Sequence, residues 1–597
     1  MNTKKHSMSA IWQYTKGYRG RLLLAFLILI LELLLSFITP LVMSVTIDSV
    51  LGDTPLNSPW YFTWILDLCG GIAYIKEHIW VMAFLIVLMA ALSGGLSIVR
   101  PALTSSAAFD IARDLRDWFY SHVQRLPFSY HAKTQTGDLI QRATSDIETT
   151  QRFLSNVMLE LLRTVFLLVV GFFLMAGLNV PLTVISFLMV PIIIVDSFWF
   201  MKKIDTIVEE FEGQESRVYT VIQENLTGAR VVRAFGREKF EVDKLHIENE
   251  TLRGQFIHFY NYLCGLWCSL DVLSGLQIAV VTILGVVFTV QDKITLGQYT
   301  AFVSYMTIFL MPVQNFGRVL GQISRTSIAV NRLEEIISEP EEDFIPQGLT
   351  PPLSGDIVFN NVSFAYDNST VLDHLNMTIH GGETIAILGG TGSGKSTLIQ
   401  LLQRLYDPSE GTITIGGVDI AQMNKHHLRQ NIGLVMQEPY LYSKTIGENI
   451  GIKYANTSQN EIEQAAKIAC VHDDIMQFEQ GYDTVIGERG VTLSGGQKQR
   501  ISIARAILGH SDILIFDDAL SAVDTRTDHS IRQALKHRQK DVTTIIISHR
   551  ISTLMEADRI FVLSRGRVAE CGTHQELIGM ENGIYRRVYD IQTQKDA

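Results

Sequence analysis

The sequence has few cysteines, and their spacing matches no metal site. Only five occur in 597 residues, at positions 69, 264, 268, 470 and 571. Cys264 and Cys268 share one face of a predicted helix, but no second pair of Cys or His accompanies them. We therefore expect five free thiols and no cysteine-bound metal.

Positive charge is also scarce. The chain has 50 Lys and Arg residues against 61 Asp and Glu residues, which gives a net charge of -11 at pH 7. A nucleic-acid-binding protein normally carries a basic face that neutralises phosphates. The composition therefore argues against a nucleic acid as the partner.

Charged residues are almost missing from long stretches of the first 325 residues. Leu22 to Ile47 contains only Glu32, whereas Ile79 to Val99 and Thr164 to Val195 contain no charged residue. Stretches this long can cross a bilayer. The remainder of the chain has the composition of a soluble α/β domain, and a chain of this length needs more than one domain. The sequence therefore predicts a membrane protein with a soluble C-terminal half.

Six membrane spans are predicted. The stretch from Thr164 to Val195 is too long for one crossing, and Asn179-Val180-Pro181 in its middle is a turn signal, so we expect two helices packed as a hairpin. The predicted domains are a six-helix transmembrane domain over 1–325, a linker over 326–352 and an α/β domain over 353–597. The spans lie near 22–47, 79–103, 157–178, 181–203, 268–290 and 294–320.

Lys and Arg predict the orientation of these spans. Five lie in residues 1–21, six in 101–156 and nine in 202–261, against Lys76 and Lys293 on the other side. By the positive-inside rule both termini are cytoplasmic. The first apolar run is too long for a cleaved signal peptide. The two inner loops have helical periodicity, so we expect the spanning helices to continue into the cytoplasm.

A phosphate-binding loop is predicted between a strand and a helix of the soluble half. The string GGTGSGKST follows the apolar run TIAIL and precedes TLIQLLQRLY, which is the context that the motif requires. Backbone N–H groups, Lys395 and the Ser396 hydroxyl would then hold the phosphates and Mg²⁺ of ATP. The loop residues are Gly389, Thr391, Gly392, Ser393, Gly394, Lys395, Ser396 and Thr397.

The second rare string is LSGGQ, and with the first it makes the chain resemble the ATP-binding cassette family across the whole soluble half. Its residues are Leu493, Ser494, Gly495, Gly496 and Gln497. The resemblance implies that two cassettes pair head to tail, so that this signature caps the ATP held by the phosphate loop of the partner chain. One chain with one cassette must therefore dimerise.

The resemblance also implies roles for single residues. Tyr366 is similar to the aromatic that stacks on adenine, Gln437 to the glutamine that contacts Mg²⁺ and water, and His549 to the switch histidine at the γ-phosphate. Asp517 corresponds to the Mg²⁺-associated aspartate, alongside Ser396 and Gln437. Ser521 to Asp524 resembles the D-loop, and Thr484 to Gly490 resembles the segment that exporters place against the membrane domain.

Asp518 departs from the family pattern. The resembled family has a glutamate here, which acts as general base on the attacking water, so the carboxylate of Asp518 is one methylene shorter. A misplacement of roughly 1 Å can cost about a hundredfold in rate. We expect the site to bind ATP and to hydrolyse it slowly. Either two such chains form a homodimer, or this chain is half of a heterodimer whose partner supplies the glutamate; the intact signature favours the heterodimer. A third alternative is that Asp518 reaches the water through a small shift of the backbone.

Six helices fused to one cassette resemble the exporter branch of the family, with a type IV exporter-like membrane domain. Thr136 to Ile147 and Gly228 to Glu238 are similar to its intracellular helices. The expected function is ATP-driven export of amphipathic or drug-like molecules, or lipids, across the cytoplasmic membrane of a bacterium. The alternatives are a homodimeric lipid or peptide exporter, an importer of, for example, metal chelates, and an ATP-gated channel.

Glu32 is the candidate residue of the substrate pathway. It lies about 15 Å into the first span at a rise of 1.5 Å per residue, and an intramembrane carboxylate points to function by default. Two interpretations stay open: Glu32 attracts a cationic substrate, or it hydrogen-bonds a neighbouring helix.

Overall fold

The computed structural model describes residues 11–52, 54–55, 60–343, 348–367, 369–454, 457–487, 493–509, 511–519, 525–538 and 542–593. The chain divides into two compact units. Unit 1 consists of Met1–Arg125 and Thr134–Pro340, and unit 2 of Leu126–Lys133 and Glu341–Ala597.

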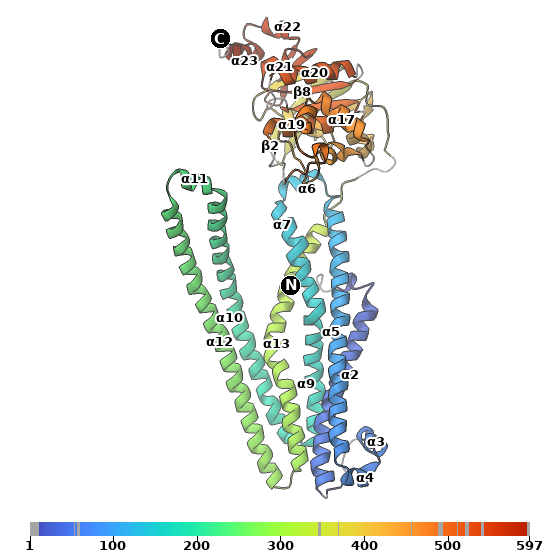
Figure 1. Ribbon diagram of the computed structural model, residues 1–597, viewed down its shortest axis with the longest axis vertical. Helices are drawn as coiled ribbons and strands as arrows, with labels where there is room; N and C mark the ends of the chain where they lie inside the picture. The colour runs from blue at the N-terminus through green and yellow to red at the C-terminus, as the bar shows by residue number, and fades with distance from the viewer. Residues whose placement is uncertain are drawn as a thin grey trace. The chain divides into compact units, whose positions relative to one another are not determined.

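The described residues of unit 1 form helices joined by short turns and loops (Figure 1). Its long helices are α2 (Arg19–Val45), α5 (Trp80–Val123), α9 (Met158–Leu178), α10 (Val180–Thr227), α12 (Glu238–Val290) and α13 (Leu296–Ile337). Its short helices are α3 (Trp60–Leu68), α4 (Gly71–Glu77), α7 (Thr136–Gln141), α8 (Ile147–Arg152) and α11 (Ala229–Ala234). Three π-helical segments extend these: η1 (Thr46–Leu51), η2 (Arg142–Asp146) and η3 (Phe153–Val157).

Local sequence sets where these helices begin. The predicted turn at residues 179–181 lies where α9 ends and α10 begins; the Asn179 side chain accepts a hydrogen bond from the backbone N–H of Leu182, and Pro181 follows in the first turn. Pro is favoured there because the first N–H groups of a helix have no acceptor within the helix, so that proline, which lacks an N–H, loses no hydrogen bond. A capping box of Thr295 and Gln298 starts α13.

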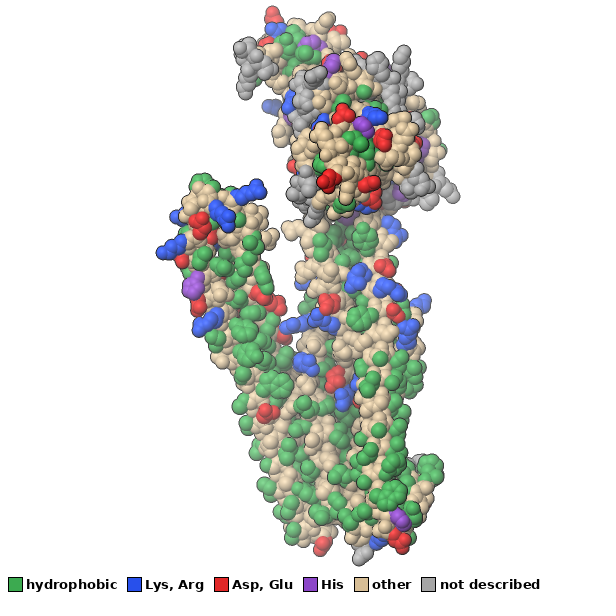
Figure 2. Space-filling view, in the orientation of Figure 1, with side chains coloured by type: hydrophobic (Ala, Val, Ile, Leu, Met, Phe, Trp, Pro, Cys, Tyr) green, Lys and Arg blue, Asp and Glu red, His purple; other side chains and the backbone are tan. Residues whose placement is uncertain are grey.

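Among the described residues of unit 1, five helical segments are long and apolar enough to cross a membrane: 19–51, 80–123, 136–178, 180–227 and 238–290. The sixth predicted span falls in α13, which forms a long helix but mixes polar residues such as Gln298 and Ser304 with apolar ones and does not meet that criterion. Figure 2 shows hydrophobic side chains covering unit 1 over the helix halves nearest α3 and α4, with charged side chains gathered toward α11.

The core of unit 1 joins α2, α9, α10, α12 and α13. Leu29, Phe37, Leu167, Ile193 and Phe309 are buried in it. Two amide side chains tie these helices together: Gln277 donates to the Ser186 carbonyl at 2.9 Å, and Gln314 donates to the Ser274 hydroxyl at 2.7 Å. Helices α10 and α12 run side by side as a hairpin that carries α11 at its tip (Figure 1).

Unit 2 contains two sheets with strand orders β2-β1-β4-β5 and β10-β9-β3-β8-β7-β6. The first is antiparallel, and in the second every pairing is parallel except that of β9 with β10. Its strands are β1 (Ile357–Tyr366), β2 (Ser369–Ile379), β3 (Thr384–Gly389), β4 (Glu410–Ile415), β5 (Val418–Asp419), β6 (Ile432–Val435), β7 (Ile513–Asp517), β8 (Thr543–Ile547), β9 (Arg559–Ser564) and β10 (Arg567–Gly572).

Helices of unit 2 flank these sheets. The α-helices are α6 (Phe128–Lys133), α14 (Lys395–Leu402), α15 (Lys425–Gln430), α16 (Ile446–Ile450), α17 (Gln459–Ile468), α18 (His472–Met476), α19 (Gly495–Ile507), α20 (Thr525–Arg538), α21 (Ile551–Leu554), α22 (His574–Ile578) and α23 (Ile584–Thr593). Short 3₁₀ turns are η4 (Ile420–Gln422), η5 (Gly451–Lys453) and η6 (Gly481–Asp483). The buried parallel strands place their carboxyl ends at one edge, where ligands of open α/β sheets bind.

Helix α6 belongs to unit 2 although its neighbours in the sequence belong to unit 1. The Phe128 ring meets the Tyr406 ring edge to face, with 5.7 Å between centroids. The Lys133 ammonium lies 2.6 Å from the Asp367 carboxylate. An aromatic contact of this kind contributes about 0.5–1.5 kcal/mol beyond burial, whereas an exposed ion pair contributes little. Phe128 is therefore the main anchor of α6.

Candidate functional site

The predicted phosphate loop connects the carboxyl end of β3 to the N-terminus of α14. Gly394 caps α14 with φ +100°, a conformation that glycine adopts without strain. A Cβ at Gly389 would stand 2.4 Å from the Ser393 hydroxyl oxygen. Glycine is therefore required at both ends of the loop, and the loop leads into the N-terminus of α14, a helix end that attracts anions.

Three functional side chains of the prediction meet at this loop. The Lys395 ammonium donates to the carbonyls of Gly389 at 2.7 Å and Gly390 at 3.0 Å. Asp517 at the end of β7 accepts a hydrogen bond from the Ser396 side chain. The structure thus brings the lysine, the hydroxyl and the aspartate of the prediction to one place.

The electrostatics of these groups show how closely they are packed. Burial lowers the pKa of Lys395, while the charges of Asp517 and Asp518 oppose that shift. Burial and the charge of Asp518 raise the pKa of Asp517; Lys395, His549 and the bond from Ser396 act in the opposite direction. Opposed shifts of this kind mark a cluster of interacting charges.

Asp518 directly follows β7 and has a left-handed backbone with φ +46°. Its N–H donates to the Ile547 carbonyl at the end of β8, at 2.9 Å. Asp adopts this conformation more readily than most residues, because its short polar side chain can hydrogen-bond locally. The backbone of the residue that the sequence predicts as general base is therefore fixed between the ends of β7 and β8.

Tyr366 ends β1 and reaches the helix that follows the phosphate loop. Its hydroxyl donates to the Gln400 side chain at 2.6 Å and lies 3.3 Å from the Thr397 hydroxyl. Its ring meets the Tyr406 ring edge to face at 5.3 Å, and Tyr406 is the residue that Phe128 contacts. The predicted adenine-stacking aromatic is thus linked through one ring to α6.

The two other predicted site residues follow strands of the same sheet. Gln437 lies just after β6 and is exposed, and His549 lies just after β8 and is also exposed, with its backbone carbonyl accepting from Gln592 at 2.7 Å. Sequence patterns did not identify Gln499, which is buried on α19 and donates to the Met436 carbonyl at 3.3 Å. Gln499 ties the helix of the signature to the backbone beside Gln437.

The LSGGQ signature forms the start of α19. Ser494 and Gln497 make a capping box: the Gln497 N–H donates to the Ser494 hydroxyl at 3.3 Å, and the Ser494 N–H donates to the Gln497 side chain at 3.0 Å. Ser494 and Gly495 are exposed at this helix N-terminus. Leu493 and the buried residues of α19 belong to a different hydrophobic cluster from those of α14. The signature therefore forms an exposed helix N-terminus that packs on a different cluster from the helix of the phosphate loop.

Some predicted positions lie outside the described residues. These are Ser521 and Asp524 of the predicted D-loop, and residues 488–490 of the segment that begins at Thr484. Thr484 itself is described; its carbonyl accepts from the Ile446 N–H at 3.0 Å.

The residues at the phosphate loop fit ATP and Mg²⁺. The Ser393 hydroxyl is buried in the loop with no hydrogen-bond partner, which is costly unless a ligand supplies one. The Ser396 hydroxyl and the Asp517 carboxylate supply the oxygen ligands that Mg²⁺ prefers, with few protein ligands and the rest from phosphate and water. No cluster of three or more His, Cys, Asp or Glu residues that could hold a metal occurs within the described part of the chain.

Glu32, the candidate in unit 1, is paired with a cation. Its carboxylate accepts from Arg100 Nε of α5 at 2.9 Å, and the exposed fractions of the two side chains are 9% and 17%. The Glu32–Arg100 contact joins α2 to α5 within the apolar part of the bundle. This geometry favours the interhelical interpretation of Glu32 over the attraction of a cationic substrate.

Comparisons with known proteins cover both units. A family model described as "ABC transporter transmembrane region" matches residues 22–313, and a model described as "ABC transporter" matches residues 372–521. The ABC transporter ATP-binding protein YknU of Bacillus subtilis (strain 168) is 34% identical over 601 residues, which cover 99% of this chain and 98% of that protein.

Two further relatives have more specific names. The "Putative multidrug export ATP-binding/permease protein YgaD" of Bacillus subtilis (strain 168) is 31% identical over 98% of this chain and 99% of its own length. The "ATP-dependent lipid A-core flippase" of Syntrophus aciditrophicus (strain SB) is 33% identical over 86% of this chain and 85% of its own length. Among solved structures, a bacterial Atm1-family ABC exporter with ATP bound has a TM-score of 0.79 at 27% identity, covering 96% of this chain and 98% of that chain.

Proposed function

The chain belongs to the ABC transporter family as a half-transporter with one transmembrane and one ATP-binding domain, and from that premise we propose that it exports small amphipathic, drug-like molecules. It is a multi-pass cell-membrane protein of the bacterial type, and its transport is coupled to ATP hydrolysis in a dimer. The observation that carries the proposal is the similarity over nearly the whole chain to proteins named as multidrug exporters.

ATP is held at the phosphate loop by this chain's own groups. Lys395 contacts the phosphates, the Ser393 hydroxyl gains the partner it lacks, and Tyr366 leaves its bond to Gln400 to stack on adenine. Ser396 and Asp517 would hold Mg²⁺, which would supply neutralisation of phosphate charge when bound, and Gln437 and His549 lie at the edge of the site. Asp518 takes the proton of the attacking water through a carboxylate that is one methylene short, so turnover here is slow.

The dimer is proposed to be a heterodimer. Two features support this proposal: the other motif residues of this site match the family pattern, and Ser494 and Gly495 are exposed at the start of α19, a helix end that favours phosphate. A second chain with a glutamate at the position of Asp518 would carry the fast site. This chain then contributes its signature to fast hydrolysis and its own phosphate loop mainly to ATP binding.

Lipids are the second candidate substrate class. Two relatives at 33% and 34% identity are named as lipid A-core flippases, and these cover 86% and 81% of this chain. A lipid and an amphipathic drug share an apolar body with a polar end, so the same helices can accept either.

The test is ATP-dependent transport in inside-out membrane vesicles that contain the complete complex. Accumulation of fluorescent amphipathic compounds inside the vesicles, lost in Lys395→Ala, is the expected result. Lys467→Ala on the exposed face of α17 is the matched control and should leave uptake unchanged. Movement of a labelled lipid alone would favour a flippase. ATP-dependent release of the compound from the vesicles would favour an importer. An ionic current that carries many ions for each ATP hydrolysed would favour a channel.

A further inference from the structure

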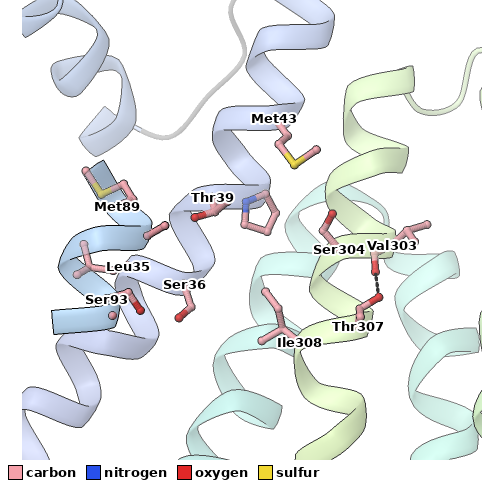
Figure 3. Close-up of a pocket in the computed structure, with 13 residues that line it drawn as sticks. Leu35, Ser36, Thr39, Met43, Met89, Ser93, Val303, Ser304, Thr307 and Ile308 are labelled. Atoms are coloured by element: carbon pink, nitrogen blue, oxygen red, sulfur yellow. Dashed lines mark hydrogen bonds between the residues drawn. The ribbon is translucent and has the colours of Figure 1, made fainter. Parts of the chain in front are cut away.

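Unit 1 contains a cavity between α2, α5 and α13 with a volume of about 720 Å³. Residues of α2 and α5 lie on one side of it and residues of α13 on the other (Figure 3). Small-molecule sites usually measure about 300–1,000 Å³. The cavity therefore has the size of a site for one small molecule.

The described residues that line the cavity include no charged side chain. Glu32, one turn before Ser36 on α2, directs its carboxylate to Arg100 instead. An organic cation entering this apolar region would lose its hydration without gaining an opposite charge, which is costly. The cavity is therefore unsuited to permanent cations and anions.

Hydroxyl groups supply the polar part of the lining, and several have already used their hydrogen atom. Ser36 donates to the Glu32 carbonyl at 2.9 Å, Ser304 to the Thr300 carbonyl at 2.8 Å, and Thr307 to the Val303 carbonyl at 2.9 Å. A hydroxyl has one hydrogen to donate and two lone pairs. These three groups can therefore only accept a hydrogen bond from a ligand, so they favour ligands with O–H or N–H donors.

The apolar part of the lining is adaptable. Met43 and Met89 contribute flexible thioether side chains, and Leu35 and Ile308 contribute branched ones (Figure 3). Methionine fills irregular space and tolerates ligands of different shape. These residues therefore do not select for one apolar ligand shape.

We infer that this cavity binds uncharged amphipathic molecules that carry hydrogen-bond donors. Such a molecule places its apolar body against Leu35, Met89 and Ile308 and its hydroxyl or amide N–H groups against the lone pairs of Ser36 and Ser304. The inference rests on the proposed export function and names the substrate class of that function.

The first experiment fills the cavity. Gly94 lines it, and Gly95 beside it on α5 does not; neither has an atom within 4 Å of where a Cβ would stand. Gly94→Phe and Gly95→Phe therefore carry the same change in helix propensity, and only the first places a ring in the cavity. With the purified complete complex in lipid nanodiscs, Gly94→Phe should lower the affinity for tritiated estradiol at least about tenfold, and Gly95→Phe should leave it within about twofold.

The second experiment tests the donors. Estradiol and its dimethyl ether have the same skeleton and charge, but only estradiol has O–H groups. The wild-type complex should bind estradiol more tightly than the ether. Ser36→Ala and Ser304→Ala should each lower the affinity for estradiol about two- to tenfold and leave the affinity for the ether unchanged.

Several results would overturn the inference. These are equal estradiol binding by Gly94→Phe and Gly95→Phe, no preference of the wild type for estradiol over the ether, and tighter binding of tetraphenylphosphonium than of estradiol with the same dependence on Gly94. Loss of the dimer in Gly94→Phe alone would show that a helix of the other chain fills the cavity. Failure of export is distinguishable: a wild-type complex that binds estradiol as expected but moves no compound into vesicles with ATP retains the site and lacks the proposed function.

Discussion

Asp518 combines the shorter of the two acidic side chains with a left-handed backbone. A residue other than Gly, Asn or Asp pays roughly 1–2 kcal/mol for this conformation. Glutamate is therefore somewhat less compatible with the local backbone than aspartate. Aspartate suits the left-handed backbone at this position, so it fits the local structure. Its disadvantage is the slower ATP hydrolysis that we expect from the shorter carboxylate.

Asp518→Glu is expected to raise hydrolysis at this site, by up to about a hundredfold, because the longer side chain restores the reach of the general base. Vanadate trapping of a photoactivatable radiolabelled ATP analogue, followed by separation of the chains on a gel, reports hydrolysis chain by chain. Asp518→Asn is the control and should not raise trapping on this chain. Unchanged trapping in Asp518→Glu would contradict the assignment of the short carboxylate as the limiting defect.

The raised pKa of Asp517 predicts a pH dependence of Mg²⁺-supported ATP binding. Mg²⁺ binds the deprotonated carboxylate, so protons compete with it, and a raised pKa makes this competition begin at a higher pH than the ordinary value of 3.8 would. Affinity measured with Mg²⁺ should therefore fall as pH decreases toward that pKa. The same titration with EDTA, or in Asp517→Asn, should be flatter; an equally steep fall in both would exclude Asp517 as the titrating group.

At this scale the sequence predicts the residues that one motif supplies and misses those that only the fold brings together. Lys395 and Ser396 are adjacent in the chain, so their spacing alone locates them. Gln499 beside the Met436 carbonyl and the left-handed backbone of Asp518 depend on strand and helix packing, which no local pattern encodes.

Among the helices, the Glu32–Arg100 pair connects α2 to α5. Removing one partner of a buried ion pair leaves an uncompensated charge and costs about 3–5 kcal/mol, whereas replacing both is often close to neutral. Glu32→Gln and Arg100→Gln should each lower the melting temperature of the complex, and the double variant should recover most of the loss. A double variant that loses the sum of the two single effects would contradict an interaction between them.

Helix α6 is expected to couple the ATP-binding unit to the remainder of its own chain. Phe128→Ala removes the ring that contacts Tyr406, so transport should fall severalfold while ATP binding stays close to wild type. Ser129→Ala on the same helix is the control. Equal loss of transport in both variants, or parallel loss of ATP binding in Phe128→Ala, would contradict a coupling role.

The long apolar helices could be predicted from composition because a bilayer-spanning run is visible without tertiary information. Their partners could not be predicted, since the Arg100 that faces Glu32 is set by the rotation of α5 about its axis. The same limit explains why the sequence left both interpretations of Glu32 open. The placement of α6 within unit 2 likewise depends on Tyr406, far along the chain.

For the whole molecule, the tip of the α10–α12 hairpin is the surface that we expect to contact a second chain. Leu226, Val231 and Phe235 are exposed there, Phe235 to 77%, and Figure 2 shows charged side chains among the hydrophobic ones at this tip. Large exposed apolar residues outside a membrane mark an interaction site. We expect them to contact the other chain of the dimer.

Heterodimer and homodimer differ in which variants of this chain stop hydrolysis. Gly495→Asp puts a carboxylate at the signature helix end, where it repels the phosphate of the partner's ATP, so total turnover should fall by about tenfold or more. Asp518→Asn should leave total turnover within about twofold in a heterodimer, because the fast site belongs to the partner. If both variants abolish hydrolysis, and native mass spectrometry shows only this chain, the dimer is symmetric.

Domain class and family could be predicted from the sequence because two rare strings occur in one soluble half and the first lies between an apolar run and a helical pattern. The composition of the dimer could not be predicted, because the residues of a partner belong to a different sequence. The departure from the family pattern at Asp518 is the feature of this chain from which we infer a heterodimer.

Because α6 belongs to unit 2, two parts of this unit are synthesised at different times. Phe128 leaves the ribosome about 280 residues before Tyr406, which at roughly 5–20 residues per second is a delay of about 15 to 55 seconds. During this interval the helix has no surface on which to dock. Unit 2 is therefore complete only after α6, which is synthesised early, docks on residues that are synthesised later. A fragment that begins at residue 341 would lack the Phe128 ring that contacts Tyr406.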